Sequence, residues 1–413
     1  MTPPDGSALR RRLGTFDAVT IGLGSMIGAG IFVALGPAAA AAGPGLLAGL
    51  AVAALIAYCN ATSSARLAAR YPASGGTYVY GRERLGEFWG YAAGWNFVVG
   101  KTASCAAMAL TVGVYVWPAH AHAVAVAAVV ALTAVNYVGI QKSALLTRVI
   151  VAVVLAVLAA VVTVVLGLGD VDTAHLIGGV GESVLGVLQA AGLLFFAFAG
   201  YARIATLGEE VRDPDRVIPR AIPIALGITL AVYAIVAVAV LAELGSAALA
   251  SATAPLTDAV TSAGVPGFAP VVAVGAAVAA LGSLLALLLG VSRTVLAMAR
   301  DRHLPHALAA VHPRFGGPHR AELTVGVVVA VVAAVADVRA AIGFSSFTVL
   351  LYYAIANAAA FTLGRRVIPV LGLVGCVVLA VLLPPASVVA GVCVALVGAL
   401  AYGLRSWPSR RAR

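Results

Sequence analysis

The chain has 413 residues, of which 62% are hydrophobic and only 10% are charged. Soluble proteins average about 45–50% apolar and about 25% charged residues, so this composition excludes an ordinary soluble domain, and disorder is excluded because it needs low hydrophobicity with high charge. The net charge of +10 is spread over short loops between apolar runs, so we expect an integral membrane protein in a lipid bilayer that binds no nucleic acid.

Continuous apolar runs of helical length predict twelve membrane-spanning helices, because about 20 apolar residues cross a bilayer. An outer-membrane barrel would show alternating strands of about ten residues instead. The predicted spans cover residues 16–41, 45–69, 88–117, 121–140, 145–167, 183–207, 219–243, 267–299, 322–337, 341–363, 367–383 and 386–404. The first span has no small-residue cleavage pattern, so we expect it to be retained rather than removed as a signal peptide.

The distribution of lysine and arginine predicts which side each loop occupies, since cytoplasmic loops carry an excess of these residues. Arg339 is the only cation in the loops predicted to lie outside. Lys101 and Arg203 fall inside predicted spans, and the other cations belong to the opposite side. We therefore expect a protein of the cytoplasmic membrane whose terminal segments, 1–15 and 405–413, both lie in the cytoplasm.

The first predicted span contains four glycines between Gly22 and Gly30, each about 1 kcal/mol less favourable than alanine inside a helix. One interpretation is a helix broken at membrane depth, where unwound backbone survives only if it lines a cavity, and where a half-helix N-terminus attracts an anion. The other is a close helix crossing through small residues such as Gly24 and Gly28. The glycine pattern alone leaves both open.

The sixth predicted span is interrupted in a similar way. A small residue and a glycine, Ala199 and Gly200, follow the aromatic run Phe195–Phe198, and Arg203 comes three residues after that glycine. Broken helices in corresponding spans indicate a substrate site at the interface of two inverted repeats. The predicted organisation is therefore a first repeat over 16–167, a second over 183–363, and two added spans over 367–404.

Four segments resemble sequence features of the amino acid-polyamine-organocation (APC) superfamily and occur in the same order as in that family. In turn they are similar to its first-span signature, its first cytoplasmic loop, its sixth-span exit and its eighth-span exit. They are Gly24–Phe32, Pro72–Phe88, Gly208–Pro214 and Ser292–Phe315. The pattern most resembles the bacterial cationic amino acid transporter-like branch. The resemblance implies an all-α membrane protein with the leucine-transporter-like 5+5 inverted repeat, broken helices one and six, and alternating-access transport of amino acids or related amines.

The resemblance also implies a substrate site at the two breaks. Backbone amides of the first span would meet the substrate carboxylate, carbonyl groups of the sixth span would meet its amine, and an aromatic side chain of the sixth span would gate the site from outside. Helix-end electrostatics agrees with this arrangement. The residues are Met26, Ile27, Gly28, Ala29 and Gly30 for the carboxylate, Phe195, Ala197 and Ala199 for the amine, and Phe195 or Phe196 for the gate. Ala29 replaces a hydroxyl residue common among relatives, so one carboxylate donor is expected to be missing.

Charged groups inside spans are functional candidates, because an ionisable group at membrane depth costs several kcal/mol without a partner or water. Many relatives that resemble this chain carry a lysine in the fifth span, where this sequence has Val154. We hypothesise that Lys101, alone or with the fixed charge of Arg203, takes over the coupling or site-charge role. The alternatives are a snorkelling Lys101, and an Arg203 that points away and pairs with Glu209 or Glu210.

The residue before Arg203 is alanine, where relatives often carry an acid, so a cationic substrate would lack that counter-charge. We therefore favour neutral amino acids as substrates, with acidic ones also compatible, over lysine, arginine or polyamines. At the cytoplasmic face we expect Glu209 and Glu210 to form a gate with Arg293 or Arg300, since alternating access needs contacts that form in one state and break in the other.

The sequence shows no metal-ligand spacing, no catalytic triad and no phosphate-binding loop, so we expect no metal, no cofactor and no enzymatic activity. The predicted function is secondary active transport of amino acids, as proton-coupled symport. Alternatives are an amino acid or amine exchanger, a polyamine or organocation permease, and a membrane sensor that binds a ligand without transporting it. A channel is disfavoured, because no repeated filter or ring of charges is visible.

Overall fold

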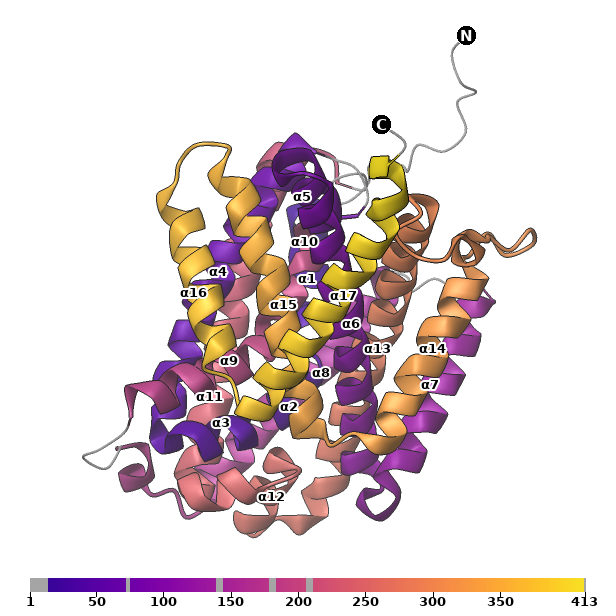
Figure 1. Ribbon diagram of the computed structural model, residues 1–413. Coiled ribbons are helices and arrows are strands. Elements are labelled where there is room, and N and C mark those ends of the chain that lie inside the picture. The colour runs from indigo at the N-terminus through magenta and orange to yellow at the C-terminus, as the bar shows by residue number, and fades with distance from the viewer. Residues whose placement is uncertain (1–13, 72–74, 139–143, 178–182, 206–210, 412–413) are drawn as a thin grey trace.

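The computed structural model describes residues 14–71, 75–138, 144–177, 183–205 and 211–411, and within these ranges it is helical with no β-strand (Figure 1). Ten helical segments among the described residues are long and apolar enough to cross a membrane. The two other predicted spans form shorter helices of 17 and 15 residues. The all-α membrane fold with about twelve spans is thus confirmed.

The helices follow the predicted spans closely, because each apolar run is bounded by glycine, proline or charged residues that end it. The spans are α1 (Thr15–Met26) with α2 (Ala29–Val33) and α3 (Leu35–Ala42), α4 (Leu46–Arg70), α6 (Glu87–Val116), α7 (Ala121–Tyr137), α8 (Ala144–Leu168), α9 (Val184–Phe198) with α10 (Ala202–Ala205), α11 (Pro214–Ser251), α13 (Ala269–Arg300), α14 (His319–Val335), α15 (Val338–Phe361), α16 (Val367–Val381) and α17 (Pro385–Arg411).

Three features differ from the simple pattern of spans and loops. The short helices α5 (Thr77–Leu85) and α12 (Pro255–Ser262) lie in segments that were expected to be loops. The seventh span is longer than its predicted range of 219–243, because α11 continues at both ends, with a kink at Gly245 where φ is +69°.

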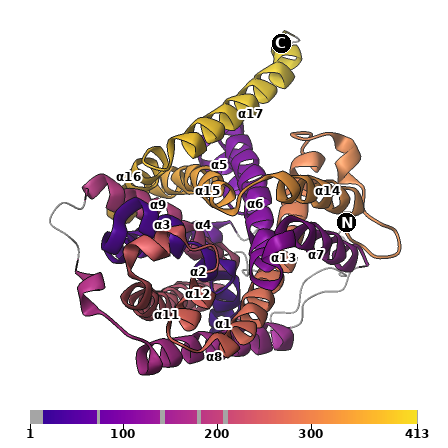
Figure 2. The ribbon, with the colours of Figure 1, turned by 90° about the horizontal axis from the view of Figure 1, so that it is seen from below.

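Helices α1 and α2 lie inside the bundle, in contact with α6, α9, α11 and α13 (Figure 2). Every residue of α2 is buried. The outer helices α14, α16 and α17 instead expose large apolar side chains, among them Val331, Val374 and Leu400. Water would penalise such a surface, whereas lipid tails accept it, so these faces are suited to contact with lipid.

The bundle has two distinct ends (Figure 1). The α5 end also holds the C-terminal part of α17. Asp17 of α1 forms an ion pair with Arg148 of α8. The α12 end lies opposite, and there the Arg339 guanidinium donates to the carbonyl oxygens of Ala250 and Ala252 at 2.7 and 3.1 Å. The division of the chain into two inverted repeats stays a prediction.

Candidate functional site

The first span is broken at Ile27 and Gly28. Helix α1 ends at Met26, Gly28 takes an extended conformation (φ −117°, ψ −142°), and α2 starts at Ala29. An added Cβ at Gly28 would overlap the Ser283 side chain of α13. Glycine is therefore needed here for the close approach of α13.

The other glycines of the first span serve close packing, which was the second interpretation of the pattern. A Cβ on Gly24 would lie 2.9 Å from the Thr147 side chain of α8, and one on Gly22 would overlap Ile204 of α10. Both interpretations therefore hold, each for different glycines. Gly22 and Gly24 let α1 approach its neighbours, and Gly28 marks the break.

The sixth span is interrupted directly beside the first break. Helix α9 ends at Phe198, a single 3-10 turn follows, and α10 starts at Ala202. A Cβ on Gly30 would lie 2.6 Å from Cα and Cβ of Ala197, and one on Gly200 would overlap the Ser25 carbonyl group. The two breaks are thus packed against each other through backbone and small residues.

Tyr233 of α11 links the two breaks. Its hydroxyl donates to the Met26 carbonyl oxygen at 2.6 Å and lies 3.2 Å from the carbonyl oxygen of Ala197. The ring is fully buried and packs on Phe198. Unpaired carbonyl groups are costly in an apolar interior, so this hydroxyl stabilises backbone that no longer makes regular helical hydrogen bonds.

A cavity of about 270 Å³ lies between the breaks and the facing helices. This volume is close to the lower limit of the roughly 300–1,000 Å³ typical of sites for drug-sized ligands, so the cavity suits a small molecule. The predicted residues that line it are Met26, Gly28, Ala29, Gly30, Phe196, Ala197, Ala199, Lys101, Arg203 and Arg293. The structure therefore brings together most of the residues predicted for the substrate site.

Three predicted residues have other surroundings, and two lie outside the described residues. Ile27 is buried away from the cavity, and Phe195 is fully buried against the Tyr353 ring, with centroids 5.9 Å apart. Of the two gate candidates, Phe196 is the one that lines the cavity. Arg300 is exposed at the end of α13, away from the cavity. Glu209 and Glu210 lie outside the described residues, so their gate with Arg293 or Arg300 stays a prediction.

Lys101 lies on the face of α6 that lines the cavity. That face presents Phe97, Lys101, Ser104 and Met108, which are spaced three or four residues apart and so share one side of a helix. The Lys101 side chain is only 6% exposed. Among the described residues it forms no ion pair or hydrogen bond, so its ammonium has no protein counter-charge there.

Arg203 and Arg293 line the same cavity from α10 and α13, and both side chains are exposed. Along α13 the lining continues from Ser283 to Ala297, and Gly75, Gly76 and Tyr78 add to it near α5. The cavity thus extends from the breaks toward the α5 end of the bundle. None of its described lining residues is an aspartate or glutamate.

The opposite side of the breaks is closed by buried groups. Phe32 of α2 is fully buried and meets the Tyr115 ring edge-on, with centroids 5.7 Å apart. The Tyr115 hydroxyl donates to the Phe32 carbonyl oxygen at 2.7 Å and accepts from the Leu256 amide of α12 at 3.5 Å. A ligand in the cavity is therefore separated from the α12 end by packed side chains.

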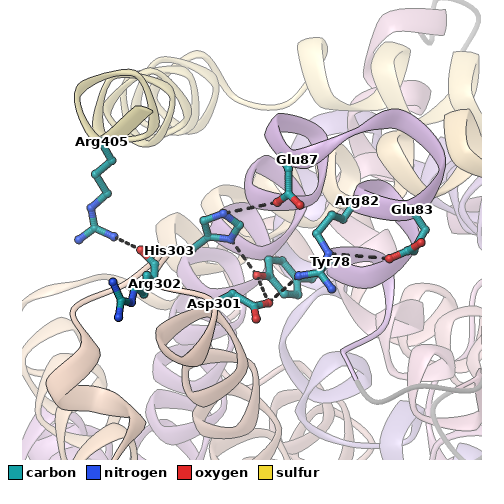
Figure 3. Close-up of polar contacts among 8 residues, drawn as sticks. All are labelled: Tyr78, Arg82, Glu83, Glu87, Asp301, Arg302, His303 and Arg405. Carbon is teal, nitrogen blue, oxygen red and sulfur yellow. Dashed lines mark hydrogen bonds and ion pairs between the residues drawn. The ribbon is translucent and has the colours of Figure 1, made fainter. Parts of the chain in front are cut away.

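A polar cluster joins α5 to the end of α13, and its member Tyr78 lines the cavity (Figure 3). The Tyr78 hydroxyl lies 2.6 Å from Asp301 Oδ2 and 2.8 Å from His303 Nδ1, and Arg82 forms an ion pair with Asp301 at 2.7 Å. An ionised Asp301 can only accept, so Tyr78 donates to it and His303 donates from Nδ1 to Tyr78. The other ring nitrogen of His303 then faces Glu87 at 3.7 Å.

Burial controls the protonation of this cluster. Burial lowers the pKa of His303 below its usual value, although Glu87 and Asp301 act in the opposite direction. Burial and the hydrogen bond to Asp301 raise the pKa of Tyr78 far above its usual value. At neutral pH both groups are therefore uncharged, and the one strong ion pair of the cluster is between Arg82 and Asp301.

Sequence reasoning missed Tyr233, Tyr115, Ser104 and Tyr352, which lie in or beside the site. Tyrosines and serines inside apolar spans are the available signal, since a buried hydroxyl needs a partner. The span pattern alone does not say which helix supplies that partner.

Taken together, the fold and the site define a multi-pass membrane protein that encloses a small cavity between two broken helices. The model of the amino acid permease family matches residues 17–369. The chain therefore belongs to the amino acid permease family, within the APC superfamily, and it is a transporter rather than an enzyme.

Individual relatives agree with this assignment. An uncharacterized transporter of Mycobacterium tuberculosis is 74% identical over 98% of this chain and 93% of its own length. Cationic amino acid transporter 7, chloroplastic, of Arabidopsis thaliana is 29% identical over 86% of this chain and 66% of its own. Branched-chain amino acid permease BcaP of Bacillus subtilis is 26% identical over 76% and 72%.

Proposed function

We propose that this chain is a secondary active transporter that carries amino acids across the cytoplasmic membrane by alternating access. The observation that carries the proposal is the cavity of about 270 Å³ lined by both helix breaks. The substrate carboxylate binds at the break between α1 and α2, along Met26 to Gly30, and the amine meets the carbonyl groups of Ala197 and Ala199. Backbone freed from helical hydrogen bonds supplies donors on one side and acceptors on the other.

Orientation follows from the basic loops. We place the α5 end, with both termini, in the cytoplasm, because cytoplasmic loops retain lysine and arginine. The cavity extends toward this end and is closed by Phe32 and Tyr115 on the other side. On this assignment the structure corresponds to an inward-facing state, and Phe196 is the aromatic residue that gates the site from outside.

Substrates without a net positive charge fit the proposal best. The described lining contains Lys101, Arg203 and Arg293 and no carboxylate, so a cationic side chain would meet like charge. The sequence favours neutral amino acids, and one relative is named for branched-chain amino acids. Another relative is named for cationic amino acids, which makes cationic substrates the class to test against.

Coupling is proposed to use protons through Lys101. An unpaired ammonium at membrane depth is costly in free energy. The neutral form of the Lys101 side chain is therefore favoured when the site is empty, and the protonated form is favoured when an anion binds beside it. Arg203 keeps its charge throughout and cannot exchange protons. A proton taken up by Lys101 on one side and released on the other would move with the substrate.

The experiment is uptake of labelled amino acids into proteoliposomes that contain the purified chain. The panel includes leucine, glutamate, glutamine, lysine and putrescine, with an inward proton gradient, without it, and with unlabelled amino acid inside. Accumulation driven by the gradient supports symport, and uptake only against preloaded amino acid indicates an exchanger. Uptake of putrescine or lysine alone indicates an organocation permease. Binding without uptake, in tight vesicles with folded protein, indicates a sensor.

A further inference from the structure

We infer that the cavity accepts amino acids with an acidic side chain, and that their second carboxylate binds against Lys101 of α6. The inference rests on the proposed function, which places the first carboxylate at the break between α1 and α2. It goes further than the preference for neutral amino acids that the sequence suggested. It is carried by two polar groups that line the cavity from α6 and α13 and have no hydrogen-bond partner among the described residues.

Lys101 is the first of these groups. Its side chain is 94% removed from solvent, it lines the cavity, and no described residue gives it an ion pair or hydrogen bond. Ser104, one turn further along α6, bonds Ser345 at 2.6 Å and the Gly100 carbonyl oxygen at 3.2 Å, and it forms no hydrogen bond with Lys101. A buried cation is costly unless paired, so the missing counter-charge is best supplied by the ligand.

Ser283 of α13 is the second group. It is 4% exposed, its hydroxyl has no hydrogen-bond partner among the described residues, and it lines the cavity in contact with the Gly28 backbone. This hydroxyl lies beside the break at Gly28, where the proposed function places the first carboxylate. Ser283 and Lys101 therefore offer one donor to each of two carboxylates within one small volume.

The remaining charges of the cavity support an anionic ligand. Arg203 and Arg293 line its path toward the α5 end, and a cleft lined by one sign of charge raises the local concentration of the opposite ion. Glu322 of α14 interacts electrostatically with Arg293, but it does not line the cavity. A lysine or arginine side chain would be repelled by the ammonium of Lys101, which has no ion pair among the described residues, whereas glutamate or aspartate would be attracted by it.

The test compares glutamate with glutamine, which has the same shape without the charge, and aspartate with asparagine. Uptake of each labelled amino acid is measured in proteoliposomes with wild-type protein, Lys101→Met and Lys101→Arg. We expect wild type to prefer glutamate over glutamine by roughly 10- to 100-fold in apparent affinity, which corresponds to one charge-assisted hydrogen bond. Lys101→Met should abolish this preference, and Lys101→Arg should keep part of it.

The matched control is Arg70→Gln, which removes an exposed cation at the end of α4, outside the cavity. It should keep the wild-type preference for glutamate. Uptake of glutamine or leucine that glutamate does not inhibit would overturn the inference and leave the proposed function standing. Retention of the glutamate preference in Lys101→Met would overturn the role of Lys101. Absence of uptake for every amino acid, in tight vesicles with folded protein, would refute the proposed function itself.

Discussion

The contact between the two helix breaks gives a sharp prediction for Gly30→Ala. An added Cβ would lie 2.6 Å from both Cα and Cβ of Ala197. Carbon atoms pack at about 3.5–4.0 Å, so one break must move by about 1 Å relative to the other. The Ala197 atoms belong to or adjoin the backbone, so no side-chain rotation can relieve the overlap.

Overpacking of this kind costs about 1–3 kcal/mol. Alanine also improves helix propensity by up to about 1 kcal/mol, which offsets part of that cost. The strain falls on the site itself, so we expect the apparent affinity for substrate to fall about tenfold, for which about 1.4 kcal/mol suffices. We also expect a lower midpoint of thermal unfolding, because the overlap lies in a closely packed interior.

The matched control is Gly227→Ala in α11, where a Cβ would meet nothing within 4 Å. It should leave uptake unchanged and leave the unfolding midpoint unchanged or slightly higher. Uptake and thermal unfolding of the two variants are measured in parallel with wild type. Wild-type affinity in Gly30→Ala would show that the close packing of the two breaks does not position the substrate, and our assignment of the site would be wrong.

Three further predictions follow from single side chains. Lys101→Met should abolish the pH dependence of uptake, and an unchanged pH profile would contradict coupling through this residue. Tyr233→Phe removes the hydroxyl that bonds both breaks. It should lower both the unfolding midpoint and the substrate affinity by the equivalent of about 1 kcal/mol. Wild-type values for both would show that this hydrogen bond is needed neither for stability nor for substrate binding. Burial holds the pKa of His303 below its usual value, so the folded protein favours the neutral imidazole ring. The neutral ring therefore stabilises the fold fully above about pH 6.5, and this stabilisation is lost as the pH falls through the lowered pKa. The unfolding midpoint should therefore decrease from about pH 7 to pH 5, and the decrease should be smaller in His303→Gln; equal decreases in both proteins would refute the role of this ring.

Much of the fold could be predicted from the sequence because the bilayer imposes a strong constraint. Backbone groups in lipid must be satisfied within each segment, so apolar runs of sufficient length become helices and their ends follow the glycine, proline and charged residues. The break near Gly28 was one of two interpretations of the glycine pattern, and the matching interruption of the sixth span together with the family resemblance favoured it. The same reasoning singled out Lys101 as a charge at membrane depth, and in the structure this residue is buried and lines the cavity.

Only the tertiary structure decided which residues face the cavity. Gly22 and Gly28 look alike in the sequence, yet one meets α10 and the other α13, because the rotation of α1 and the neighbours it meets depend on the whole bundle. Phe195 and Phe196 are equally apolar, and packing against Tyr353 turns the first away from the cavity. The carbonyl groups that Tyr233 stabilises belong to two segments far from it in sequence, and no local pattern encodes such a contact. Local composition determined the spans and their breaks, and long-range packing determined the site.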